Sequence, residues 1–343
     1  MKNKILLVLT GGTICSFKKE ESGKLNSDVN EAKRLIIDNF KNGKSKYTGV
    51  TFDEKAPLDT LSENMTVEKW NRLLDFLREY EAAEDYDGII ILHGTDTLAY
   101  TSALLSLALG SFSVPVMLVS SQLALSDKKA NGNANFKAAV ELIMNGIKPN
   151  VYAVYRNSDG KMYLHKGAEL LQCGSYSEDF FSKGMVSVCK RNAVSEGAEF
   201  KGRDVLGNVK ALRNPVLKIE PYVGIDYNFF DLQGVEAVVH GAFHSETACV
   251  EIKERGEIYS GSSVLSLVDR CNERGIPFII EPCSEAAFRY ESTSRILEKG
   301  AFGVYGMTSE MVYVKALVGA SSGYSGEKLI LFLNEDINNE FIY

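Results

Sequence analysis

Short apolar runs rich in β-branched residues alternate with longer amphipathic segments along this chain, and this alternation limits the folds that it can adopt. Parallel strands that are buried on both faces give near-continuous apolar runs, and the helices that cover them give amphipathic ones. We therefore expect an α/β protein, with an N-terminal doubly wound, mostly parallel sheet and a smaller C-terminal α/β domain. The expected strands are 5–9, 88–92, 114–120, 151–155, 216–219, 235–239 and 276–280.

Helices are expected where apolar residues recur on one face. Thr66 precedes Trp70, Leu73, Leu74 and Leu77, and the spacing of these four apolar residues (i, i+3, i+4, i+7) predicts a helix with Thr66 as its N-cap. Similar spacing in 100–109 and 136–144 predicts two more helices. We interpret all three as structural elements.

The length of 343 residues exceeds what one hydrophobic core usually supports, so two domains are expected. The alternation of strands and helices weakens around 187–213, where charged residues and glycine dominate. We therefore expect a catalytic domain over 1–190, a connection over 191–212 and a second domain over 213–343.

Composition excludes several classes of protein. The chain has 45 acidic against 38 basic residues and a net charge of -7, which is the wrong sign for a surface that follows phosphates, so nucleic acid is not the expected partner. No apolar run is long enough to span a membrane, and the run from Ile5 to Leu9 is too short for a signal peptide, so a cytoplasmic protein is expected. The six cysteines form no C-x-x-C pair and are interpreted as buried free thiols. The four histidines have no metal-ligand spacing, and no metal site is expected.

Two threonine-bearing loops each follow an expected strand. Thr10-Gly11-Gly12-Thr13 follows 5–9, and His93-Gly94-Thr95-Asp96-Thr97 follows 88–92. Open α/β sheets bind ligands at the carboxyl ends of their strands, so both loops reach the ligand-binding edge. A threonine hydroxyl becomes a nucleophile when a base takes its proton, and Asp96 is suited to orient such a base. The alternatives are plain turn chemistry at the glycines and capping of a helix that begins near Leu98.

A third polar segment, Asp59-Thr60-Leu61-Ser62-Glu63-Asn64-Met65, leads into the helix that contains Trp70 and can also be interpreted as a cap. These three segments, in this order and at these spacings, resemble the bacterial-type asparaginase and glutaminase family, which includes the asparaginase-like subunit of transfer-RNA-dependent amidotransferase. The segments 9–14 and 87–101 resemble its two signatures, 62–66 resembles its Ser-x-(Asn/Asp)-Met segment, and 115–122 resembles the strand and loop that follow. The resemblance is strong over 1–150.

The resemblance implies a hydrolase that removes the side-chain amide of a small amino acid without a metal or an organic cofactor. It implies that Thr13 attacks the amide carbonyl and that Thr95 and Asp96 work with a lysine to activate the nucleophile or water. It also implies that the substrate is held by Ser62, Glu63 and Asp96, and that Ser121 lies in the loop that contributes to substrate binding. A homodimer or homotetramer is implied, because a neighbouring subunit completes the pocket in that family.

Two departures from the family pattern concern basic and hydroxyl groups. The family lysine falls at Leu170 or at Gln172, depending on the alignment, and neither is a lysine. Lys166 can replace it only if the loop differs in length. The lid segment 16–26 lacks the family tyrosine, and Gly23-Lys24 stands where Gly-Tyr is expected. Lys24 is either an exposed lysine or a substitute base.

Three hypotheses remain open. The first is an asparaginase-type amidohydrolase that uses Thr13 with Thr95 and Asp96. The second is an amino-acid-binding protein that has lost turnover, and the third is an enzyme on the same scaffold that acts on a different amide. Of these, we favour the first.

Overall fold

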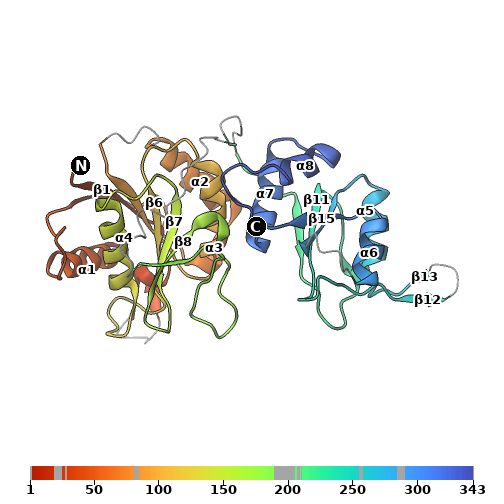
Figure 1. Cartoon of the computed structure of the whole chain (residues 1–343), viewed down its shortest axis with the longest axis horizontal. Coiled ribbons are helices and arrows are strands. Elements are labelled where there is room, and N and C mark those ends of the chain that lie inside the picture. The colour runs from red at the N-terminus through yellow and green to blue at the C-terminus, as the bar shows by residue number, and fades with distance from the viewer. Residues whose placement is uncertain are drawn as a thin grey trace. The chain divides into compact units, whose positions relative to one another are not determined.

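The computed structural model describes residues 2–18, 25–27, 29–80, 85–188, 205–206, 209, 211–254, 258–283 and 290–342. The chain divides into two compact units (Figure 1). Unit 1 contains Met1–Val205 and Ile337–Asn339, and unit 2 contains Leu206–Asp336 and Glu340–Tyr343. Unit 1 therefore takes three residues from near the end of the chain. Among them, the Asn338 side-chain amide donates to the Ser106 carbonyl oxygen at 2.6 Å.

Unit 1 is built on a seven-stranded sheet with the order β4-β1-β5-β6-β7-β8-β9. The first five strands in this order are parallel, and β8 and β9 are antiparallel additions at one end. The strands are β1 (Lys4–Leu9), β4 (Thr51–Lys55), β5 (Gly88–Leu92), β6 (Val116–Val119), β7 (Val151–Arg156), β8 (Met162–Lys166) and β9 (Val186–Ser187), and a separate hairpin pairs β2 (Ser16–Lys18) with β3 (Leu25–Ser27).

Helices cover both faces of this sheet (Figure 1). On one face, α1 (Val29–Lys41) and α4 (Gly132–Met144) share a core with β1, β5, β6 and β7. The other face carries α2 (Val67–Arg78) and α3 (Leu98–Ala108), with the short 3-10 turns η2 (Ser62–Asn64) and η3 (Gly167–Glu169). The 3-10 turn η1 (Thr13–Cys15) instead packs with α1, and its Ile14 and Cys15 belong to the core of the first face. Because the chain passes from β1 to β4 on one side and then to β5 on the other, a topological switch point lies between β1 and β5.

Unit 2 has a smaller, fully parallel sheet with the order β10-β11-β14-β15. Its strands are β10 (Val216–Ile219), β11 (Ala237–Gly241), β14 (Phe278–Cys283) and β15 (Phe302–Tyr305), beside the antiparallel pair β12 (Ile252–Glu254) and β13 (Ile258–Tyr259). The helices are α5 (Val264–Asn272), α6 (Glu291–Glu298), α7 (Ser309–Ser321) and α8 (Gly326–Leu333), with a 3-10 turn at η4 (Tyr227–Phe229).

The expected α/β class, with a large mostly parallel sheet and a smaller one, is confirmed. The expected helix after Thr66 is also confirmed: the Thr66 hydroxyl accepts from the Lys69 N–H at 3.3 Å, and the four apolar residues of the pattern are buried. Sequence reasoning missed β4 because its sequence TFDEK is polar. As an edge strand it pairs with β1 alone and keeps half-exposed side chains.

Some expectations fall on residues that the structure does not describe. Most of the predicted connection over 191–212 lies outside the described residues, although the division between the units falls within it. The predicted domain limits therefore stay a prediction. Of the described cysteines, Cys15, Cys271 and Cys283 are buried as expected, whereas Cys173 and Cys249 are half-buried.

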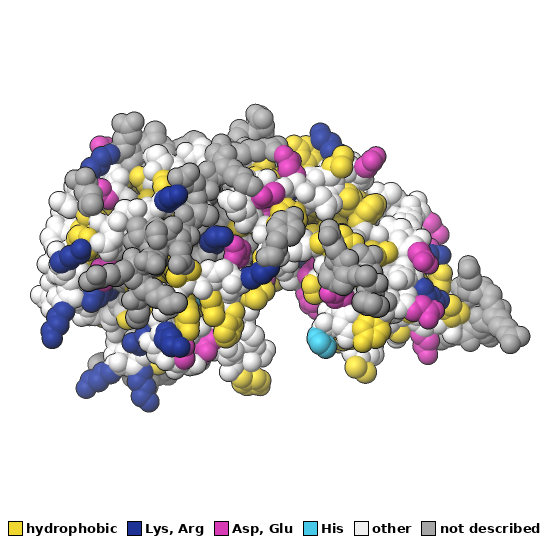
Figure 2. All heavy atoms as spheres, in the orientation of Figure 1, with side chains coloured by type: hydrophobic (Ala, Val, Ile, Leu, Met, Phe, Trp, Pro, Cys, Tyr) yellow, Lys and Arg dark blue, Asp and Glu magenta, His cyan; other side chains and the backbone are white. Residues whose placement is uncertain are grey.

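Within the described residues, no helix combines the length and the apolar content that crossing a bilayer requires. On the face of the molecule in Figure 2, lysine and arginine side chains are separated by uncharged surface over much of the area, and acidic side chains lie among them.

Candidate functional site

Three loops meet at the switch point without intervening side chains. The Gly11 backbone forms a bridge with Thr60, and the Thr10 carbonyl accepts from the Thr60 N–H at 3.0 Å. A Cβ atom on Gly12 would lie 2.4 Å from the Cα and N of Gly94, and one on Gly94 would lie 2.3 Å from the Ser62 Oγ. Real side chains do not fit at such distances. The loops after β1 and β5 and the turn before α2 are therefore in direct backbone contact.

The backbone conformation also requires glycine after β1. Gly11 and Gly12 have φ angles of +104° and +82°, which side-chain-bearing residues rarely adopt. Thr13 follows as the first residue of η1 and is half-buried. Thr10 anchors the loop from the other side, because its hydroxyl donates to the Leu92 carbonyl at 2.8 Å. Thr13 and Thr95 thus each lie one residue beyond the glycines that touch, at the same edge of the sheet.

Ser62 and Asp96 form a reciprocal pair. The Ser62 hydroxyl donates to Asp96 Oδ2 at 2.9 Å and accepts from the Asp96 N–H at 3.2 Å. The Thr97 hydroxyl donates to the Ser62 carbonyl at 3.0 Å, which fixes the same turn. The Asp96 carboxylate is therefore oriented by Ser62 rather than used as the cap of α3, whose N-cap residue is Thr97.

His93 is a structural histidine beside the second threonine loop. The Trp70 indole donates to the Thr101 hydroxyl at 3.0 Å, and that hydroxyl lies 3.0 Å from His93 Nε2. His93 Nδ1 lies 2.8 Å from the Gly94 carbonyl, which can only accept. This assigns the proton to Nδ1 and a neutral ring, consistent with burial, which lowers the His93 pKa. The chain of bonds holds the backbone immediately before Thr95.

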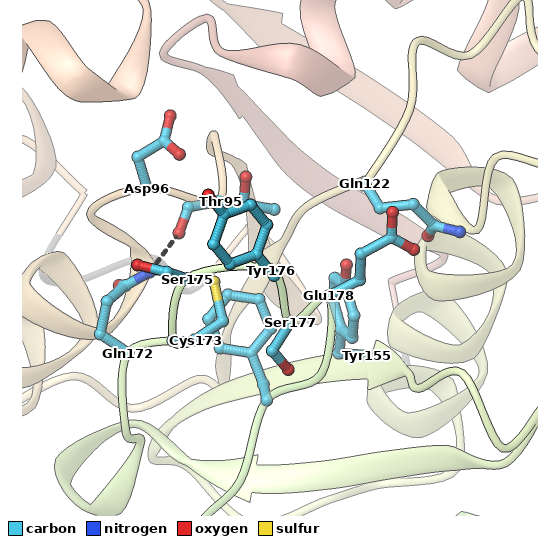
Figure 3. Close-up of a pocket in the computed structure, with 12 residues that line it drawn as sticks. Thr95, Asp96, Gln122, Tyr155, Gln172, Cys173, Ser175, Tyr176, Ser177 and Glu178 are labelled. Atoms are coloured by element: carbon cyan, nitrogen blue, oxygen red, sulfur yellow. Dashed lines mark hydrogen bonds between the residues drawn. The ribbon is translucent and has the colours of Figure 1, made fainter.

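Gln172 contacts the backbone on the other side of Thr95. Its side-chain amide donates to the Thr95 carbonyl at 2.8 Å and accepts from the Ala99 N–H at 3.2 Å (Figure 3). Of the two positions where the family lysine was expected, Gln172 therefore reaches the Thr95 loop, while Leu170 is buried in the core. An uncharged amide cannot take up a proton near neutral pH.

Neither proposed substitute base is seen beside Thr95. Lys24 lies outside the described residues. Lys166 Nζ is 2.8 Å from Glu169 Oε1, whose side chain is nearly buried. If Lys166 left this pair, the buried Glu169 carboxylate would lose its cation, a change that typically costs about 3–5 kcal/mol. The geometry therefore gives Lys166 a structural partner.

The substrate-binding candidates differ in accessibility. Glu63 is exposed, whereas Ser62 and Ser121 are buried. The Ser121 hydroxyl donates to the Leu123 carbonyl at 2.6 Å and accepts from the Gly132 N–H at 3.1 Å, so it is engaged by backbone. Whether these residues bind substrate stays a prediction.

A cavity of about 390 Å³ opens beside Thr95 and Asp96 (Figure 3). Its described lining comes from the second threonine loop, from the strand ends beyond β6 and β7 and from the 172–180 segment, and consists of Thr95, Asp96, Gln122, Tyr155, Gln172, Cys173, Gly174, Ser175, Tyr176, Ser177, Glu178 and Phe180. Thr13 is not among these residues. Sequence reasoning had not linked Gln122, Tyr155 or Glu178 to the site, although the position of Tyr155 at the carboxyl end of an expected strand pointed to this edge.

The Cys173 thiol is a further potential nucleophile in this cavity, beside the hydroxyl groups of its lining. Burial and the nearby Asp96 carboxylate raise its pKa, although a hydrogen bond from Gln172 opposes this. A raised pKa keeps the thiol protonated, and the thiolate is the reactive form. The raised pKa therefore leaves little of Cys173 in the reactive thiolate form.

Two hydroxyl-bearing loops in contact at the switch point of a doubly wound sheet define an α/β protein with a candidate ligand site at its strand ends. The sequence model of the family described as "Asparaginase, N-terminal" matches residues 4–199, more than half of the chain, and the protein belongs to this family. The resemblance inferred from the three polar segments is thereby confirmed.

Comparison with individual relatives gives a consistent result. The chain is 31% identical to L-asparaginase from Thermococcus kodakarensis over 44% of each chain, and 32% identical to L-asparaginase 1 from Escherichia coli over 42% of this chain and 41% of the relative. It is 23% identical to a subunit of glutamyl-tRNA(Gln) amidotransferase from Methanosphaera stadtmanae over 99% of this chain and 77% of that protein. The matches to the two asparaginases thus span less than half of their length.

Solved structures show the same fold over the whole chain. L-asparaginase I from Vibrio cholerae superposes with a TM-score of 0.74 at 22% identity, covering 99% of both chains. The thermostable L-asparaginase from Thermococcus kodakarensis gives a TM-score of 0.71, also at 22% identity and 99% coverage of both. Membership of the family supports amidohydrolase activity in general.

Proposed function

We propose that this protein hydrolyses the carboxamide of a small amino-acid amide, L-asparagine first among them, with Thr13 as the nucleophile. The observation that carries the proposal is the backbone contact between Gly12 and Gly94, which brings the loops of Thr13 and Thr95 together at the switch point. Family membership supports the reaction class.

In the proposed reaction, the Thr13 hydroxyl oxygen bonds to the amide carbon, its proton passes to the leaving nitrogen, and the carbon–nitrogen bond breaks to release ammonia. Water then cleaves the ester to give the carboxylic acid and restores the hydroxyl. Asp96, held by Ser62, is proposed to orient the base that transfers these protons or to stabilise the protonated form of that base. Ser62, Glu63 and Ser121 are proposed to bind the amino and carboxylate groups of the substrate.

The presence of Gln172 at a position where the family lysine was expected favours a variant of this proposal, in which the substrate is another amide or turnover is low. The side-chain amide next to Thr95 orients the loop but supplies no base. A protein that binds an amino acid without turnover is the remaining alternative. The relation to an amidotransferase subunit adds the further possibility that the ammonia serves a partner protein.

Ammonia release by the purified protein tests the proposal. Asparagine and glutamine are assayed with the wild type, Thr13→Ala, Thr95→Ala and the control Thr51→Ala, whose exposed hydroxyl only bonds the Asn3 carbonyl. Turnover that disappears in the first two variants and persists in the control supports the proposal. Turnover that survives Thr13→Ala excludes Thr13 as nucleophile, and aspartate binding without turnover supports the binding protein.

We also propose a homodimer or homotetramer that acts in the cytoplasm on small molecules. Light scattering at several protein concentrations tests the assembly, since a monomer at all concentrations contradicts it.

A further inference from the structure

The wall of the cavity opposite Thr95 contains polar atoms that lack a hydrogen-bond partner of normal geometry among the described residues. Figure 3 shows Thr95 and Asp96 on one side and Gln122, Tyr155 and Glu178 on the other. Tyr155 is 1% exposed, and within the described residues the carboxamide oxygen of Gln122 has no hydrogen-bond partner, while the Tyr155 hydroxyl has the Asn131 side-chain amide nearby but outside normal hydrogen-bond geometry. Leaving a buried polar atom unsatisfied costs about 1–3 kcal/mol. Two such atoms on one cavity wall point to a ligand that completes their bonds.

The Tyr155 ring and the Gln122 backbone are held in place by their surroundings. The Tyr155 ring packs edge-to-face on Phe180, with centroids 4.9 Å apart. The Gln122 backbone N–H donates to Asn131 Oδ1 at 3.1 Å, which fixes the start of its loop. Burial raises the pKa of Tyr155 to about 12, an effect that the nearby Asn131 amide opposes and the Glu178 charge reinforces. The hydroxyl therefore remains protonated and can donate or accept.

The charges around this wall select the ligand. Among the described residues that line the cavity, the ionisable carboxylates are Asp96 and Glu178, and none is a lysine or an arginine. Gln122 offers an amide oxygen, Glu178 offers a carboxylate and Tyr155 offers a hydroxyl oxygen. Arg156 lines the neighbouring pocket that shares Gln122 and Glu178, but none of the described ion pairs joins it to Glu178. Three acceptors, one of them a carboxylate, suit a cationic group with several N–H donors, which is an ammonium.

We propose that Gln122, Tyr155 and Glu178 form a second subsite of the cavity, which binds an ammonium group of the substrate away from the carboxamide, placed by the proposed function where the Thr13 and Thr95 loops meet. This subsite extends the substrate class to small carboxamides whose amino group lies farther from the amide than in asparagine. A cavity of about 390 Å³ lies in the range of pockets that bind small organic ligands, roughly 300–1,000 Å³, and leaves room for such a molecule. The position of the carboxamide rests on the proposed function, whereas the ammonium subsite rests on its own wall.

The test compares 4-aminobutanamide with butanamide, which is the same amide without the amino group. Calorimetry measures binding, and ammonia release measures turnover, in the wild type, Glu178→Gln and Tyr155→Phe. The matched controls are Glu68→Gln, an exposed carboxylate on α2, and Tyr152→Phe, on the same strand as Tyr155, whose hydroxyl donates to the Lys148 carbonyl. Thermal unfolding of each variant verifies that it is folded.

We expect the wild type to bind 4-aminobutanamide at least 10-fold more tightly than butanamide. Glu178→Gln and Tyr155→Phe should each reduce that preference by about 10-fold, corresponding to 1.4 kcal/mol, while the controls retain it. A wild type with no preference, or a preference that survives both substitutions, overturns the subsite. If binding follows this pattern but no amide is hydrolysed, the subsite stands and the proposed amidohydrolase fails. If turnover depends on Thr13 but 4-aminobutanamide binds no more tightly than butanamide, the proposed amidohydrolase stands and the ammonium subsite fails.

Discussion

Replacement of Gly12 by alanine tests whether the contact between the two threonine loops is as close as the structure shows. The new Cβ would lie 2.4 Å from the Cα and N of Gly94, whereas carbon atoms in contact are ordinarily 3.5–4.0 Å apart. The loops would have to separate by about 1 Å. Overpacking of this kind typically costs about 1–3 kcal/mol, and the φ of +82° adds about 1–2 kcal/mol for a residue with a side chain.

Gly146→Ala is the matched control, because Gly146 has a φ of +80° in an exposed turn and its Cβ would meet no atom within 4 Å. Urea unfolding should therefore show a loss of about 1–2 kcal/mol for Gly146→Ala and about 2–5 kcal/mol for Gly12→Ala. A displacement of 1 Å at a reacting group can lower the rate about 100-fold, so kcat/KM for ammonia release should fall by that factor in Gly12→Ala and stay unchanged in the control. Equal behaviour of the two variants in both assays would refute the loop contact.

Three further predictions concern other parts of the molecule. Ser62→Ala removes the hydrogen bond that orients Asp96, so kcat/KM should fall about 10-fold or more, while Ser45→Ala, which loses its bonds to the Glu141 carboxylate and from the Tyr47 N–H, should keep its rate. Lys315→Met leaves the fully buried Glu340 without its cation and should destabilise unit 2 by about 3–5 kcal/mol, against less than about 1 kcal/mol for Lys299→Met at the surface pair with Asp269; equal losses would contradict this. Burial lowers the pKa of His165 to about 4, below about 6.5 in the unfolded chain, so the stability that it contributes is complete above pH 6.5 and is lost as pH falls toward 4. Between pH 7.5 and 5.5 the wild type should therefore lose about 1 kcal/mol more than His165→Asn in urea unfolding, and an equal loss would show that His165 does not titrate in this way.

The central strands could be predicted from the sequence because they are buried on both faces and therefore apolar throughout. Gly88–Leu92 and Val216–Ile219 were expected with the limits that the structure has. The edge strand Thr51–Lys55 could not be predicted, since its one neighbouring strand leaves its polar side chains partly exposed. An apolar run in the sequence indicates a strand that is buried, and a partly exposed edge strand lacks such a run.

The site was predictable to the extent that it follows the strand ends. Two threonine loops after parallel strands have to reach one edge of the sheet, and the structure brings their glycines into contact. The opposite wall was not predictable, because nothing in the sequence around Tyr155 or Gln122 indicates that their polar atoms remain without partners. That property depends on tertiary neighbours, as does the position of Gln172, which is set by the length of its loop.

The return of Ile337–Asn339 to unit 1 has a consequence for biosynthesis. A ribosome has synthesised nearly all of unit 2 before the residues that complete unit 1 emerge, so the threonine-bearing unit cannot reach its final packing while the chain is still being elongated. Ile337 and Asn338 are each 2% exposed, and their loss would uncover the interior around Ser106. A nonsense codon before Ile337 would therefore impair the portion of the protein that is translated first.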